Sequence, residues 1–572
     1  MKKLLSVILS VLMITACMVP AFSVSAAAEN YPIIVLRGDG TQIYVPDENE
    51  PTGERNVWGD AFTSIEGGSI TDSVANILLP FLTEGLLFDK WDNYYDAFYE
   101  EIAPIFEELR LDGDGNPRYN SGLGKDDLKN NADTRKVNYV NWNGTYNLGS
   151  YTYRYDWRLS PFDVIDDLDG YIRDIMTKTG KEKVNLVANC LGGSYVLAYL
   201  EKYGKDGHIS NVFFNATVGN GTAVLTDAFC GDIEVNAKGI QRYAHQSVNL
   251  DNGGLFGLIQ LSDMMSDIVF DSYDLLTQTG VVDQLGLTFD QLYQKIYEGL
   301  VPHLALAIFG TMPGYWTAVE SERYEEARSF IFGKEGDEFY DEYAGVVAKN
   351  DLYYEKVSSK AYDIIADCQA KGVRFGANVK YGVQMYPFVK SQNKLSDEMV
   401  DVENASFGAT TAKDVFSKLS DEYVENAKAN GTDKYISPDR QIDVSTSIFK
   451  DTLWVQKNVC HNRWVMDDKI ALEFCRSNDF NVNSDPKYPQ FMIYIPGTMQ
   501  WDEIEGAYDD DTGDIVPMTA ENCELTLWDD MPDDSKKEPT VISRLMAFFR
   551  WLTTMFKFLT GKLTEKPVVD VQ

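Results

Sequence analysis

Residues 184–197 read VNLVANCLGGSYVL, and this stretch decides the fold. It gives a short apolar strand over 184–188, then a Gly-rich turn, then a helix over about 191–203. A turn of this kind is a nucleophile elbow, in which the strand and helix pass so closely that small residues are needed two before and two after the centre. Ala188 and Gly192 meet that demand. We therefore expect Cys190 to stand above the sheet edge, in a strained backbone conformation at the helix N-terminus.

Cysteine at the centre of the elbow suits nucleophilic chemistry. A thiol at a helix N-terminus and near a histidine is favoured as the thiolate, which is a good nucleophile. The alternative is that Cys190 is a small buried residue at a site whose catalysis was lost, since buried free cysteine is common. The amide of Leu191 is one expected oxyanion donor, and the second is expected from the loop after the first strand, at Gly38, Asp39 and Gly40. The carboxylate of Asp39 is an unfavourable neighbour for an oxyanion.

The rest of the chain alternates strands with helices. Strands are predicted over 31–36, 137–140, 151–157, 212–214, 373–383, 453–456 and 491–495, and a helix over 161–179. This alternation predicts an α/β fold with a mostly parallel sheet covered by helices on both faces. Residues 220–371 have helical spacing without clear strands, which indicates a helical cap inserted between two halves of the core, 29–219 and 372–520. The fold expected is therefore the α/β-hydrolase fold, in which such elbows occur.

Chain order selects the base and leaves two choices for the acid. In that fold the nucleophile comes first, then the acid, then the histidine. His461 follows the strand over 453–456, whereas His245 and His303 fall in the expected cap and His208 comes just after the elbow helix. Asp397 is the expected acid, and Asp401 in the same loop is the alternative. An orienting acid holds the imidazole in the useful tautomer.

Both ends of the chain carry segments outside this core. Residues 1–28 have the basic start, apolar stretch and Ala-rich end of a secretory signal peptide, so we expect a secreted protein. A lipoprotein with a lipidated Cys17 is the alternative. Residues 521–540 are predicted to be an acidic linker. Residues 541–563 form a basic amphipathic pattern, typical of a helix lying on a membrane surface or docking on the protein's own core.

Composition excludes several classes of function. A formal charge of −37 argues against nucleic-acid binding, which needs a basic face. The cysteines lack the density of a disulfide scaffold. The chain contains neither a C-x-x-C pair nor an H-E-x-x-H sequence, so we expect no metal site.

These residues resemble the lecithin:cholesterol acyltransferase family, which has the α/β-hydrolase fold. Residues 155–160, YDWRLS, match its YDWR-type stretch, and residues 184–200 are similar to its strand–elbow–helix segment, where the family has His-Ser in place of Asn189-Cys190. Further similarity lies in 215–222, 312–316, 396–400 and His461. The resemblance implies cofactor-free acyl chemistry on lipid esters through an acyl-enzyme, by a hydrolase or an acyltransferase. The alternative is an inactive protein of this fold that binds a lipid or the cell envelope.

Overall fold

The computed structural model describes most of the chain between residues 31 and 527. The described parts are 31–38, 41–57, 88–133, 150–235, 309–463, 465–495 and 514–527, with shorter pieces between them. Several predictions therefore lie outside the described residues: the signal peptide, Cys17, Asp39, Gly40, His245, His303, the helix over 541–563 and all of the acidic linker beyond residue 527.

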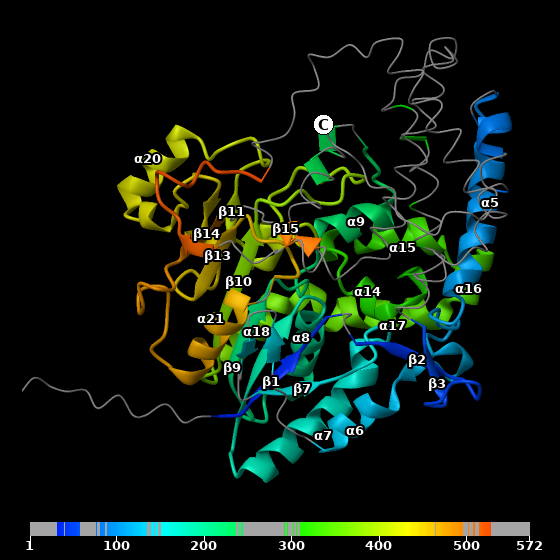
Figure 1. The fold of residues 1–572 in the computed structure, drawn as a ribbon, viewed down its shortest axis with the longest axis horizontal. Helices are drawn as coiled ribbons and strands as arrows, with labels where there is room; N and C mark the ends of the chain where they lie inside the picture. The colour runs from blue at the N-terminus through cyan, green and yellow to red at the C-terminus, as the bar shows by residue number, and fades with distance from the viewer. Residues whose placement is uncertain are drawn as a thin grey trace, which may run out of the picture.

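An eight-stranded sheet forms the centre of the fold (Figure 1), in the order β17-β14-β13-β10-β9-β8-β1-β7. Neighbouring strands are parallel throughout, except for the antiparallel pair of β14 and β17. This is the mostly parallel sheet of an α/β fold, as predicted. The strands are β1 (Ile33–Leu36), β7 (Ser150–Tyr153), β8 (Val184–Asn189), β9 (Ile209–Asn215), β10 (Arg374–Tyr381), β13 (Leu453–Lys457), β14 (Phe491–Ile495) and β17 (Asp514–Pro517).

Helices cover both faces of the sheet. Leu186 and Ala188 of β8 face the helices α7 (Pro161–Thr179), α8 (Gly192–Tyr203) and α18 (Ala361–Gln369). Val187 points the other way, into a second apolar cluster that includes Phe474 of α21 (Val465–Arg476). Because side chains alternate along a strand, burial on both faces requires the continuous apolar runs seen in the sequence.

The ends of α7 agree with the prediction of a helix over 161–179. Pro161 occupies the first turn, where its missing N–H costs nothing, and Gly180 ends the helix in the left-handed conformation at φ +65°. Ile165, Leu168, Ile172 and Ile175 are fully buried along one stripe. This helix therefore follows directly from local sequence signals.

The described residues of the block 220–371 are largely helical. The block contains α9 (Ala223–Cys230), α14 (Pro313–Trp316), α15 (Tyr324–Phe332), α16 (Glu338–Glu342) and α17 (Ala344–Lys356), which gather on one side of the molecule (Figure 1). Phe229 of α9 packs on Trp316 with ring centroids 4.8 Å apart. The last helix of the block, α18, packs against α8 and β10, so it belongs to the helical layer of the sheet.

Two predicted strands differ in extent from the observed ones. β7 ends at Tyr153, and the segment after it turns so that Trp157 and Arg158 are buried. β5 (Tyr139–Asn141) pairs with β6 (Gly144–Tyr146) in a separate hairpin. The other described elements are β2 (Ile43–Pro46), β3 (Glu54–Asn56), β4 (Gly122–Leu123), α5 (Asp92–Ile102), α6 (Lys125–Asp133), α19 (Val402–Ala405), α20 (Asp421–Asn430), β11 (Thr410–Thr411), β12 (Ile442–Asp443), β15 (Trp501–Asp502), β16 (Ala507–Tyr508) and several short 3-10 or π turns.

The strand order places a switch point between β1 and β8. The chain passes from β1 to β7 on one side, and later from β8 toward β14 on the other. In open α/β sheets, ligands bind beyond the carboxyl ends of the strands at such a point. β1 runs into Gly38 there, and β8 runs into Cys190.

Candidate active site

Cys190 occupies a tight turn between β8 and α8. Its φ is +52°, which is uncommon for a residue that carries a Cβ atom. Gly192 is required two residues later, because a Cβ at that position would lie 2.5 Å from the carbonyl oxygen of Leu36. Backbone strain of this kind concentrates at functional sites, where the surrounding structure holds it in place. The turn has the geometry expected of a nucleophile elbow.

Cys190 also differs from the other cysteines in its exposure. It is partly exposed, whereas the other cysteines that the structure describes are all buried. Gly38, at the end of β1, lies against it: a Cβ on Gly38 would be 2.8 Å from the Cβ of Cys190 and 3.1 Å from its Sγ. The same point is 3.3 Å from the amide nitrogen of Leu191. Gly38 and the Leu191 amide therefore both border the thiol.

His461 and Asp397 form a buried pair beside Cys190. Nδ1 of His461 lies 2.8 Å from Oδ2 of Asp397, and both side chains are almost fully buried. The backbone N–H of His461 also donates to the carbonyl oxygen of Asp397 at 2.9 Å. Oδ1 of Asp397 accepts from the amides of Val400 at 2.8 Å and Met399 at 3.2 Å. The carboxylate is thus fixed by its own loop and leaves Oδ2 for the imidazole.

The pKa of His461 reflects this arrangement. Burial by itself lowers that pKa, but the charge of Asp397, the charge of Cys190 and the hydrogen bond to Asp397 together raise it to about 10. The imidazole therefore lies near the thiol and is hydrogen-bonded to the carboxylate. The structure brings together Cys190, His461 and Asp397, three residues that are far apart in the sequence.

The YDWR segment anchors both ends of the loop that contains Gly38. The hydroxyl of Tyr155 donates to the carbonyl oxygen of Arg37, and Nε1 of Trp157 donates to that of Thr41 at 2.8 Å. A buried ion pair of 2.6 Å between Asp156 and Arg158 stiffens the segment. The family resemblance marked this motif in the sequence, but its structural role is visible only in the folded chain.

The alternative acid, Asp401, makes other contacts. Its Oδ1 accepts from the amide of Ala223 at 2.8 Å, at the start of α9, and its Oδ2 accepts from the amide of Asn404 at 3.2 Å. Asp401 therefore caps α19 and joins that helix to α9. The carboxylate that contacts His461 belongs to Asp397.

A second carboxyl group, Glu398, is buried next to Asp397, and sequence analysis did not identify it. Its φ of +96° is strained for a residue with a side chain. Tyr243 donates a hydrogen bond of 3.0 Å to its Oε1. Burial raises the pKa of Glu398 to about 7, although this hydrogen bond and the charge of His461 lower it. The only sequence signal was the acidic residue itself.

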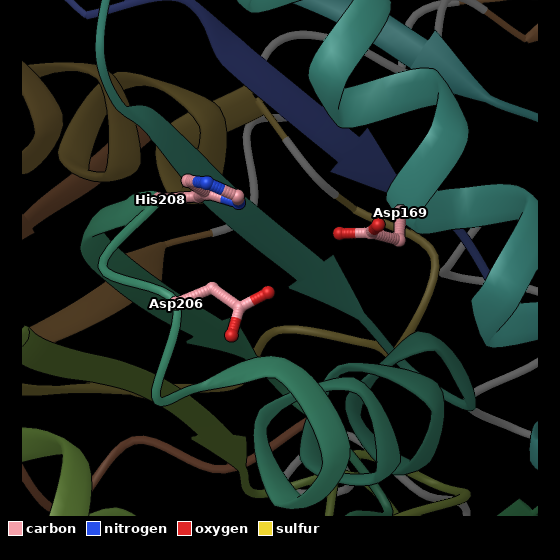
Figure 2. Close-up of side chains that lie close together, drawn as sticks. All are labelled: Asp169, Asp206 and His208. Carbon is pink, nitrogen blue, oxygen red and sulfur yellow. The ribbon is translucent and has the colours of Figure 1, made fainter.

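His208 lies in a different cluster. Figure 2 shows the side chains of Asp169, Asp206 and His208 converging, and one ligand atom from each lies within 4.8 Å of the others. However, Arg173 donates to Asp169 at 2.6 Å and to Asp206 at 3.1 Å. The guanidinium already pairs with both carboxylates, so this cluster is an ion-pair network between α7 and the loop before β9.

Comparison with known proteins adds no assignment. No family model, curated protein or solved structure matches the chain. Among the described helices, none is long and apolar enough to span a membrane.

Proposed function

We propose that this protein is an enzyme of the α/β-hydrolase type that cleaves or transfers the acyl group of lipid-like esters. One observation carries the proposal: a partly exposed Cys190 in a strained turn lies close enough to His461 for its charge to raise the pKa of that imidazole, and the same imidazole is held by Asp397 at 2.8 Å. A nucleophile, a base and an orienting acid in this arrangement are the parts that acyl transfer needs.

The chemistry follows from the positions of these groups. The Cys190 thiolate attacks the ester carbonyl, a C–S bond forms, and the oxyanion accepts hydrogen bonds from the Leu191 amide and the Gly38 loop. The C–O bond then breaks, and the protonated His461 gives its proton to the departing alkoxide. Water or an alcohol attacks the thioester while His461 takes its proton. The acid or new ester leaves, and the thiolate and imidazolium are restored.

The resemblance to the lecithin:cholesterol acyltransferase family supports the choice of lipid esters. The YDWR segment holds the loop bordering Cys190, which gives that motif a reason to accompany the elbow. A secreted protein that meets its substrate at a membrane surface, through residues 541–563, fits this proposal.

The test is ester hydrolysis across acyl chains from acetyl to palmitoyl. We expect turnover by the parent, and a loss of at least about 10³-fold in Cys190→Ala and His461→Ala. Cys368→Ala is the matched control, because Cys368 is a buried thiol in α18. Mass spectrometry should find the acyl group on Cys190 of the parent after rapid acid quench.

Two outcomes would overturn the proposal. Turnover that survives Cys190→Ala would place the chemistry elsewhere. A silent parent whose Cys190→Ser variant gains activity would mean that natural turnover has been lost, which favours a lipid- or envelope-binding role.

A further inference from the structure

Lys380 is a buried cation beneath the candidate site. It lies near the end of β10 and is 1% exposed. Its Nζ donates to the carbonyl oxygen of His461 at 2.7 Å, to Oδ2 of Asp467 at 2.8 Å and to the carbonyl oxygen of Arg463 at 3.3 Å. An ammonium group has three N–H donors, and three acceptors lie within reach. Two of these acceptors are main-chain atoms of the loop that carries His461.

Asp467 completes the network from the first turn of α21. Its side chain is fully buried, and Oδ1 accepts from Asn378 at 3.0 Å and from Gln456 at 2.6 Å. Gln456 also donates to Oδ1 of Asn378 at 2.8 Å. The network therefore joins β10, β13, the His461 loop and α21. It fixes the direction of the carboxylate that holds Lys380.

A fully buried ion pair needs an explanation other than stability. Removing two charges from water costs free energy that their attraction often fails to repay, and apolar replacements are frequently as stable. Here the cation also holds the backbone of His461, whose N–H is held by the carbonyl oxygen of Asp397. The peptide groups on both sides of the imidazole are therefore fixed, so the ring has little freedom to move away from Cys190.

We infer that Lys380 is a positioning residue for His461, and that Asp467 orients it, so that the imidazole stays in register with the Cys190 thiol. The inference deepens the acyl-transfer function proposed above and rests on it for its effect on turnover. Its effect on the thiol does not need an ester substrate.

Three variants separate positioning from stability. Lys380→Met removes the donors and leaves Asp467 unpaired. Lys380→Met/Asp467→Asn removes both charges and retains an amide oxygen for Asn378 and Gln456, so it should recover stability. Lys457→Met is the matched control, because Lys457 forms another buried pair with Asp439 at 3.0 Å and donates to the carbonyl oxygen of Cys523 at 2.5 Å.

Two readouts are measured on each folded variant: kcat and KM for a soluble ester, and the rate of Cys190 alkylation by iodoacetamide against pH. For the double variant we expect normal stability with kcat about 10²-fold lower and KM within about threefold of the parent, since small displacements of a catalytic group cost that much. Its alkylation profile should differ from that of the parent, because the displaced imidazole no longer lies next to the thiol. Lys457→Met should keep both readouts of the parent.

The outcomes separate the two proposals. A double variant that recovers stability, kcat and the alkylation profile together would overturn the positioning role, and so would equal losses in Lys457→Met. If the parent hydrolyses no ester while the double variant still shifts the alkylation profile, positioning stands and the proposed function fails.

Discussion

Substituting Gly38 by alanine tests how closely the end of β1 approaches the thiol. A methyl group there would begin 2.8 Å from the Cβ of Cys190 and 3.1 Å from Sγ. Reaching an ordinary contact of about 3.4 Å needs a movement of about 0.6 Å (3.4 − 2.8), in a region where packing is dense. The methyl would also lie 3.3 Å from the Leu191 amide, on the face that we propose for the substrate oxygen. Loss of one oxyanion donor typically lowers kcat by about 10²- to 10³-fold, or about 3–4 kcal/mol.

The assay compares kcat for a soluble ester with the free energy of unfolding in urea. We expect Gly38→Ala to lower kcat by at least about 10²-fold and to reduce stability by about 1–3 kcal/mol, the usual cost of overpacking. Gly170→Ala is the control, because a Cβ at that position in α7 would meet nothing within 4 Å. A folded Gly38→Ala protein with the parent's kcat would refute the close approach or its role in catalysis.

Three further predictions concern the residues around the site. The free energy of unfolding of Glu398→Gln, relative to that of the parent, should increase by about 3 kcal/mol from pH 4.5 to pH 7. The reason is that the pKa of Glu398 rises from 4.5 to about 7 on folding, so the parent loses stability as pH increases through that window. A difference that is independent of pH in urea titrations would contradict this. Asp401→Ala should lower the free energy of unfolding by about 2–4 kcal/mol, since it leaves the buried amides of Ala223 and Asn404 without their acceptor, but it should keep the kcat of the parent. Asp397→Ala should lower kcat by about 10⁴-fold. Equal losses of kcat in the two variants would contradict the assignment of Asp397 as the acid that orients His461. Gly192→Ala should unfold or strongly destabilise the protein, because the new Cβ would lie 2.5 Å from a backbone oxygen. Gly170→Ala should instead raise the free energy of unfolding by about 0.5–1 kcal/mol. Thermal unfolding of the two variants measures both effects.

Short-range sequence patterns determined the parallel sheet, the two ends of α7 and the turn at Cys190. Each of these features depends on neighbouring residues: apolar runs for strands buried on both faces, Pro161 and Gly180 at the helix ends, and small residues on either side of Cys190. They could be predicted because the energy that selects them is local. Chain order also pointed to His461.

Tertiary structure alone decided between the two acids. Asp397 and Asp401 lie four residues apart in one loop, and nothing in their immediate sequence distinguishes a histidine partner from a helix cap. The structure assigns them through distant groups, His461 for one and the Ala223 amide for the other. The sequence held one further signal, a lysine within the apolar strand β10, since buried lysines are rare without a partner.

The remaining part of the site could not be read from the sequence because it depends on contacts across long chain separations. Lys380 contacts the carbonyl oxygen of His461, and Trp157 reaches Thr41 at the far end of the loop bordering Cys190. Main-chain carbonyls carry no residue identity, so no sequence pattern marks them as acceptors. Sequence by itself determined which main elements form and where the turn at Cys190 would stand. Only the folded chain decided which buried groups hold the imidazole and the Gly38 loop beside Cys190.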